Sequence, residues 1–181
     1  SGHAIINKLA KHTSPVQEVS IIPRGGAGGY TLSADDDRIF YYRDRLFCRI
    51  QVLLGGIMAE KLYVGDISTG ASNDIERASE IARNMVTKYG MSEKLGPITF
   101  GSGHNEVFLG KDYGTVRNYS EDIAKEIDAE VNNIVTNGYK RCEALLRENI
   151  DKHAGTSKNV GLSLKLLEKM NKEDFSDIQT I

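Results

Sequence analysis

The chain has 181 residues, of which 40% are hydrophobic and 27% charged, so it is long enough for one domain with a sizeable core. Its net charge of −2 gives no electrostatic reason to expect nucleic acid as a partner. The longest apolar run, VLLGGIMA at 52–59, is much shorter than the roughly 20 residues that a membrane span needs.

The N-terminal region is predicted to form a helix followed by a β-hairpin. Apolar residues recur at helical spacing across residues 1–12, SGHAIINKLAKH. Residues 16–22 are rich in valine and isoleucine, which favour strands, and Pro23 ends that run. The glycines of GGAGG then allow the backbone to turn before a second short strand, YTL at 30–32.

A long helix is predicted from about residue 42 to residue 63. Gly55 and Gly56 interrupt it, and two glycines inside a helix cost roughly 1 kcal/mol each relative to alanine. We therefore expect them to lie where another element packs closely against the helix. A polar loop, VGDISTGASND at 64–74, follows.

The clearest helix of the chain is predicted over residues 73–90. Asn73 fits an N-cap, with Glu76 three residues later, and Gly90 fits the end of the helix. At about 100° per residue, the segment presents one apolar arc that should face the core. The residues of this arc are Ile75, Ala78, Ile81, Ala82, Met85, Val86 and Tyr89.

The rest of the chain is predicted to be helical, apart from short extended pieces at 96–101 and 106–110. A long helix is predicted over about 119–152 and a weaker one over about 160–170. With the hairpin near the N-terminus, the prediction is a mainly α fold with a small β part.

No arrangement of side chains predicts nucleophilic or nucleotide chemistry. The sequence has no G-x-S-x-G pattern, and no G-K-[ST] follows the glycines of GGAGG. Cys48 and Cys142 each lie in a helical pattern, far apart in sequence. This favours two reduced, buried thiols over a disulfide.

Asp74 is the residue that helix geometry singles out as a candidate for chemistry. It falls at the edge of the apolar arc, so its carboxylate should lie at the boundary between core and solvent. The alternative is that Asp74 only stabilises the positive end of the helix dipole, by about 0.3–1 kcal/mol. His3 alone is typical of a surface residue near a chain end, and His12, His104 and His153 show no ligand spacing.

Several segments taken together resemble the protease domain of the FtsH family, whose members are membrane-anchored, ATP-dependent zinc metalloproteases. The resemblance runs from Ser1 to about Asp151, and its most specific part is TGASNDIERA within 66–78. The other matching segments are SGHAI (1–5), VSIIPRG (19–25), GYTL (29–32), the rest of 52–101, EVFLG (106–110) and RNYSEDIAKEIDAEV (117–131).

The resemblance implies a zinc site. In that family the first helix carries H-E-x-G-H, and Ser1, Gly2 and His3 match its last three positions. Two histidines four residues apart on a helix reach one Zn²⁺, and the glutamate between them is the general base toward zinc-bound water. The family's third protein ligand is an aspartate that aligns with Asp74. His3 and Asp74 are thus the implied metal ligands.

The first histidine and the catalytic glutamate of the motif would then lie directly ahead of Ser1, so no catalytic base is assigned within the chain. With two of three ligands, zinc is expected to be weakly bound or absent. We expect little or no peptidase activity from the chain as given.

The resemblance also implies a substrate site and partners. Polypeptide substrates are expected to add as a strand along Val19, Ser20, Ile21 and Ile22, although these residues also fit an ordinary core strand. The family implies a homo-oligomeric ring, a hexamer, with ATP used only by an ATPase module upstream. The membrane anchor is also upstream, which implies the cytoplasmic face of the bacterial inner membrane or an organelle interior.

The C-terminal part departs from the family pattern. Residues 152–167, KHAGTSKNVGLSLKLL, insert glycines and polar residues where the family has a leucine-rich helix. We expect the segment 152–181 to pack differently or loosely, while residues 1–181 as a whole form a single protease domain.

Two other hypotheses remain open at this point. The chain could be a non-catalytic module for ring assembly or partner binding, with a degenerate site in which Asp74 only starts a helix. The sequence directly ahead of Ser1 would discriminate, because His-Glu there means an enzyme. The chain could also be a helical interaction domain unrelated to proteases, which would require the match over 52–101 to be chance.

Overall fold

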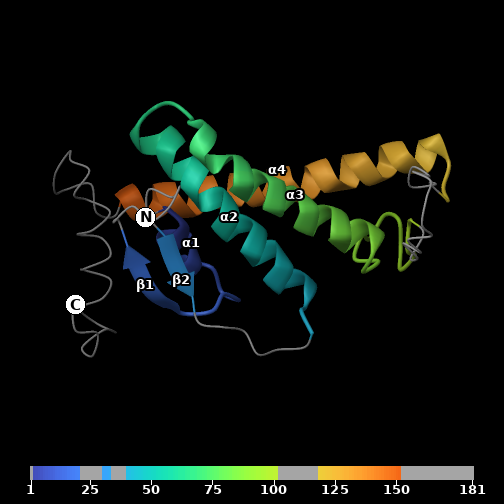
Figure 1. Ribbon diagram of the computed structural model, residues 1–181, viewed down its shortest axis with the longest axis horizontal. Helices are drawn as coiled ribbons and strands as arrows, with labels where there is room; N and C mark the ends of the chain where they lie inside the picture. The colour runs from blue at the N-terminus through green and yellow to red at the C-terminus, as the bar shows by residue number, and fades with distance from the viewer. Residues whose placement is uncertain (1, 21–29, 34–39, 102–117, 152–181) are drawn as a thin grey trace, which may run out of the picture.

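The computed structural model describes residues 2–20, 30–33, 40–101 and 118–151 (Figure 1). This part of the chain is mainly helical with one small antiparallel sheet, which confirms the predicted fold class. The elements are α1 (Gly2–Leu9), β1 (Val16–Ser20), β2 (Tyr30–Ser33), α2 (Arg43–Tyr63), the 3₁₀ turn η1 (Thr69–Ala71), α3 (Ser72–Thr87) and α4 (Glu121–Asp151).

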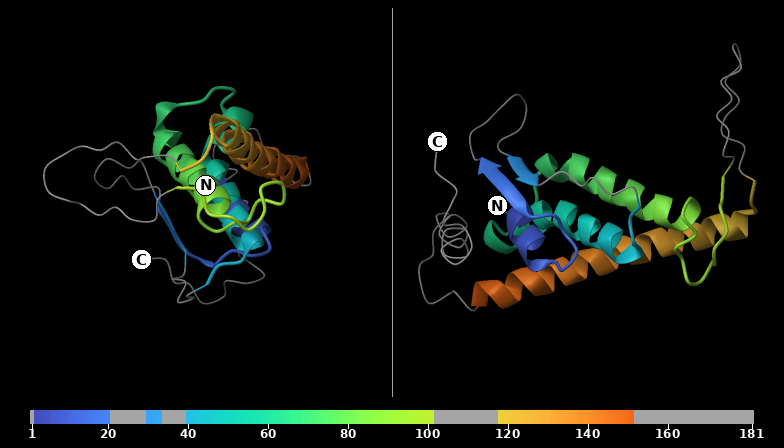
Figure 2. Two further views of the ribbon diagram at one scale, coloured as in Figure 1. Left: turned by 90° about the vertical axis from the view of Figure 1, so that its right-hand side faces the viewer. Right: turned by 90° about the horizontal axis from the view of Figure 1, so that it is seen from below.

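The predicted hairpin is present. Strands β1 and β2 pair antiparallel, with Val19 opposite Thr31 and Ser20 opposite Tyr30. The predicted turn falls within residues 21–29, which lie outside the described part of the chain. The hairpin lies beside α1, at the end of the molecule where α4 ends (Figures 1 and 2).

Helix α2 is the central element, because α1, α3 and α4 all pack against it. Helix α4 runs the length of the helical layer, with α2 and α3 lying along it (Figure 2). The main core joins α2, α3 and α4. Its buried residues are Leu46, Ile50, Leu53, Leu54, Ile57, Ala71, Ala78, Ala82, Met85, Val86, Ile127 and Val131.

A second core cluster holds α1 in place. It is formed by Ile5 and Ile6 from α1, Met58 from α2, and Cys142 and Leu146 from α4. Ile6, Met58 and Cys142 are fully buried. Since α1 has only eight residues, it depends on this packing rather than on its own helix propensity.

The start of α3 differs from the prediction. Asn73 is not the N-cap: α3 begins at Ser72, and Ala71 at the N-cap position makes no side-chain cap hydrogen bond. The turn η1 leads directly into α3, and its own cap is Ser68, whose Oγ accepts a hydrogen bond from the Gly70 amide. The capping side chain therefore belongs to Ser68, ahead of the 3₁₀ turn, whereas the capping rule considers only the residue directly before the α-helix.

Two members of the predicted apolar arc are exposed. Ile75 is 39% exposed because it lies in the first turn of α3, ahead of Ala78, the first buried residue of the helix. Tyr89 is 55% exposed because α3 ends at Thr87. Gly90 follows with φ of 59°, as expected for a glycine just beyond a helix end.

Three further predicted segments do not appear as regular elements of the described structure. The extended piece predicted at 96–101 is irregular, and its Phe100 amide donates a hydrogen bond to the Thr87 carbonyl. The pieces predicted at 106–110 and 160–170 lie outside the described residues. Among the described helices, none is long and apolar enough to cross a bilayer.

Both cysteines are buried and free, as predicted. Burial raises the pKa of the Cys142 thiol to about 12, and the neighbouring Glu143 carboxylate adds to the shift. The thiol is therefore protonated at neutral pH and behaves as a small apolar side chain in the second core cluster.

Candidate metal site

His3 is the second residue of α1, and close contact with α2 fixes its position. A Cβ added to Gly2 would lie 2.1 Å from the Gly55 carbonyl oxygen, so the two helices meet backbone to backbone. One residue further along α2, Gly56 lies against the His3 imidazole. Gly55 and Gly56 thus both lie where another element packs closely, as predicted from the sequence.

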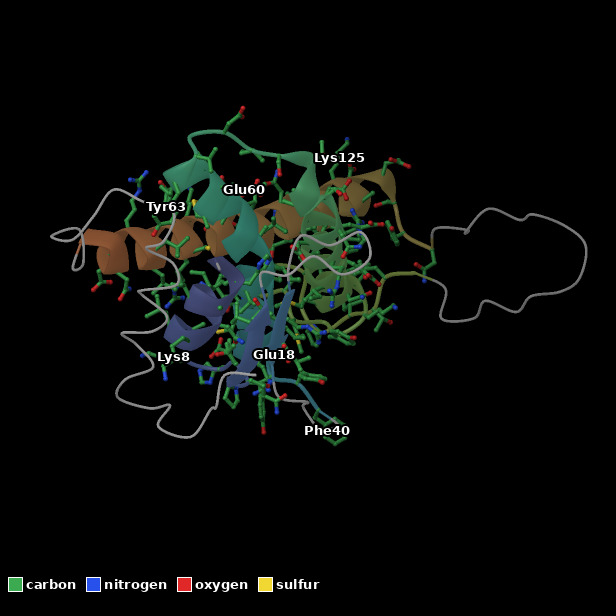
Figure 3. The ribbon with its side chains drawn as sticks, turned by 60° about the vertical axis from the view of Figure 1, so that its left-hand side comes forward. Lys8, Glu18, Phe40, Glu60, Tyr63 and Lys125 are labelled. Atoms are coloured by element: carbon green, nitrogen blue, oxygen red, sulfur yellow. The ribbon has the colours of Figure 1, made fainter. Side chains whose placement is uncertain are left out.

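Asp74 lies in the first turn of α3, a helix that also packs against α2. Glu60, in the last turn of α2 and labelled in Figure 3, binds the loop that leads to Asp74. The Glu60 carboxylate accepts hydrogen bonds from the Ser68 backbone amide at 3.0 Å and from the Ser68 hydroxyl. This contact fixes the chain at Ser68, four residues before α3 begins.

Replacing Ser68 with alanine should weaken this fastening. The substitution removes both the hydroxyl bond to Glu60 and the cap on Gly70, so we expect unfolding free energy to fall by about 1 kcal/mol. Urea denaturation measures the loss. Ser79→Ala is the matched control, because the Ser79 hydroxyl only bonds to the Ile75 carbonyl within the same helix. Equal stability losses in the two variants would contradict this role of Ser68.

The two candidate ligands lie side by side. His3 Nε2 is 2.9 Å from Asp74 Oδ2, and the side chains are 30% and 27% exposed. The carboxylate only accepts hydrogen bonds, so the imidazole donates its Nε2 proton. Residues 71 positions apart in sequence thus meet at one partly exposed point, reachable from solvent and bordered by the core.

The geometry of this pair suits a shared metal ion. Bonds of about 2.0–2.2 Å from a tetrahedral zinc ion place a nitrogen and an oxygen ligand about 3.4 Å apart. The observed separation of 2.9 Å therefore needs to widen by only about half an ångström. An imidazole nitrogen and a carboxylate oxygen are also donor types that zinc accepts.

The described residues supply two donors and no more. Within that part of the chain, no group of three or more histidine, cysteine, aspartate or glutamate side chains is placed to hold a metal ion. His12 is exposed beyond the end of α1, and His104 and His153 lie outside the described residues. The roles of His3 and Asp74 as ligands stay a prediction that rests on their proximity and donor chemistry.

The predicted substrate strand is only partly described. Val19 and Ser20 belong to β1, whereas Ile21 and Ile22 lie outside the described residues. In the described sheet, β1 pairs only with β2, which leaves its second edge without a strand partner. That edge belongs to a strand in contact with α1, the helix that carries His3.

The comparison with known proteins assigns the chain to a family. The model of peptidase family M41 matches residues 1–178. The chain belongs to this family. As an M41 domain it is not an unrelated helical interaction module, so that hypothesis from the sequence is wrong.

Curated relatives of this M41 domain are described as ATP-dependent zinc metalloproteases. FtsH 1 of Thermoanaerobacter sp. (strain X514) is 53% identical over 179 residues, which cover 98% of this chain and 29% of the relative. FtsH of Caldicellulosiruptor bescii is 49% identical over 176 residues, covering 97% and 28%. FtsH of Thermotoga maritima is 49% identical over 150 residues, covering 82% and 25%. The chain thus spans less than a third of the length of these relatives.

Proposed function

We propose that this M41 chain is the zinc-peptidase domain of an ATP-dependent protease and acts in the hydrolysis of peptide bonds in polypeptide substrates. The observation that carries the proposal is the 2.9 Å approach of His3 Nε2 to Asp74 Oδ2, from the helices α1 and α3, which both pack against α2. We further propose that residues 1–181 form a single domain, in keeping with a family match over 1–178.

In this proposal His3 and Asp74 hold the metal ion. His3 would give up its Nε2 proton, so that the nitrogen lone pair faces the ion, while Asp74 offers Oδ2. When bound, zinc supplies a water of lowered pKa and polarises the carbonyl of the scissile bond. Gly2, Gly55 and the Glu60–Ser68 contact keep the two donors in place without contributing donors themselves.

The rest of the reaction machinery belongs to the H-E-x-G-H motif, whose last three positions match Ser1, Gly2 and His3. The first histidine of that motif would be the third ligand and its glutamate the general base. Both positions would precede Ser1 in the full-length protein. The 181-residue chain by itself is therefore proposed to bind zinc weakly and to be inactive.

Substrate binding is proposed along the second edge of β1, at Val19 and Ser20 and onward through Ile21 and Ile22. An extended peptide added there would bond mainly through its backbone, which suits a protease that accepts many unfolded sequences. Assembly into a hexameric ring, ATP use by an upstream module and anchoring at the cytoplasmic face of the bacterial membrane are proposed for the whole protein. These proposals rest on the relatives, which are ATP-dependent zinc metalloproteases, and on the family resemblance.

Metal analysis and casein digestion of the 181-residue chain test this proposal. We expect substoichiometric zinc after dialysis and no casein turnover. His3→Ala and Asp74→Asn should each abolish the remaining zinc affinity, because the first removes one of two donors and the second replaces a charged carboxylate ligand with a neutral amide. His12→Ala is the matched control and should leave zinc affinity unchanged. Stoichiometric zinc with robust turnover in the unaltered chain would overturn the proposal, and so would wild-type zinc affinity in His3→Ala.

A further inference from the structure

Gly56 bounds one side of the His3 ring. A Cβ built on Gly56 would lie 2.4 Å from His3 Cε1, 2.9 Å from Nε2 and 3.3 Å from Nδ1. Real Cβ atoms do not approach other atoms to 2.4 Å, so the imidazole occupies the space that any side chain at position 56 would need. The atoms involved include Nε2, the nitrogen that faces Asp74 Oδ2 at 2.9 Å.

From this contact we infer that Gly56 is a positioning residue for His3. The bare surface of α2 at Gly56 acts as a stop against which the imidazole rests, and it sets the approach of Nε2 toward Asp74. This inference rests on the proposed metal site for its functional meaning. The contact itself concerns only the residues of this chain.

The neighbouring Gly55 does a different job. A Cβ at Gly55 would lie 2.9 Å from the Gly2 carbonyl oxygen and 3.1 Å from Ile6 Cγ1, so it would meet backbone and buried core. A Cβ at Gly56 meets the atoms of one side chain that is 30% exposed. The ring can therefore turn toward solvent when position 56 is enlarged, while α1 and α2 stay packed. Gly55 acts on folding, and Gly56 acts on the direction of His3.

The test is Gly56→Ala in the 181-residue chain, compared with Gly138→Ala. Gly138 is a helical glycine of α4, whose added Cβ would lie nearest to apolar side chains of α2, with Ile50 Cγ2 at 3.1 Å and Leu54 Cδ1 at 3.6 Å. In the unaltered chain, NMR should show an Overhauser contact between the Gly56 Hα protons and His3 Hε1. In Gly56→Ala the His3 ring signals should shift and lose contact with α2, while the thermal midpoint stays within a few degrees of the parent.

Zinc titration followed on the His3 ring signals gives the functional readout. We expect at least tenfold weaker binding in Gly56→Ala and a change of less than twofold in Gly138→Ala. A missing Gly56–His3 Overhauser contact overturns the inference, as does zinc binding in Gly56→Ala within twofold of the parent. If the Overhauser contact is present and lost in Gly56→Ala, but the parent ring does not respond to zinc at all, the positioning stands and the proposed metal function fails.

Discussion

Adding His-Glu directly ahead of Ser1 should convert the chain into a stoichiometric zinc binder with peptidase activity. The added histidine lies four residues before His3, one helical turn away on the same face, so both imidazoles reach the ion that Asp74 shares. Removing a residue that is only hydrogen-bonded to a metal ligand already lowers metal affinity by about 10- to 100-fold. A whole additional ligand should have a larger effect, so we expect zinc affinity to rise by more than about 100-fold. Competition with a zinc chelator and cleavage of a fluorogenic peptide measure the two gains.

An extension by His-Gln separates the two gains from each other. It restores the third ligand but not the general base, so zinc affinity should match that of the His-Glu form. Peptidase activity should be lower by about 10²- to 10⁴-fold, the usual contribution of a positioned general base. If the His-Glu form remained metal-poor, the assignment of His3 and Asp74 as partial ligands would be refuted, whatever the family.

Leu146→Ala should be among the most destabilising substitutions in the described part of the chain. Leu146 is 1% exposed and packs with Ile5, Ile6, Met58 and Cys142, where α1 meets α2 and α4. Truncating a fully buried leucine removes its transfer energy and leaves a cavity, so unfolding free energy should fall by about 2–5 kcal/mol. Guanidinium denaturation measures the change.

The adjacent Leu145 offers a control of identical chemistry. It is only partly buried and lies at the margin of the same cluster, so Leu145→Ala should cost less than about half as much. Because the cluster holds the short helix α1, amide exchange in Leu146→Ala should accelerate in α1 before it does in α3. Equal losses in the two variants, or unchanged exchange in α1, would contradict this account of how α1 is held.

Much of the helical architecture could be predicted from the sequence because periodic apolar patterns mark buried faces. The sequences of α2, α3 and α4 follow such patterns closely. Gly55 and Gly56 correctly predicted that another element packs closely against α2. The errors fall where local signals compete. Asn73 has the right chemistry for an N-cap, but the 3₁₀ turn η1 runs directly into α3, so the helix begins before Asn73. Capping rules describe a single helix start and do not anticipate a preceding 3₁₀ turn.

The site was less accessible to sequence reasoning. Helix geometry placed Asp74 at the edge of the core, but only the family resemblance connected it with His3, since no local pattern joins residues 71 apart. The Glu60–Ser68 contact left no signal in the sequence, and Gly56 indicated a close neighbour without identifying it as the His3 imidazole. Both depend on how α1 and α3 are placed around α2, which is a tertiary property.

The arrangement of His3 and Asp74 on two different helices has one thermodynamic consequence. An ion held by both atoms would act as a cross-link that closes a loop of about seventy residues, and such a closure costs the unfolded chain more entropy than the folded one. Metal loading and conformational stability would then rise and fall together. A protease of this design would lose its rigidity at the same moment as its ion, and the unloaded domain would be the form most open to degradation by other proteases.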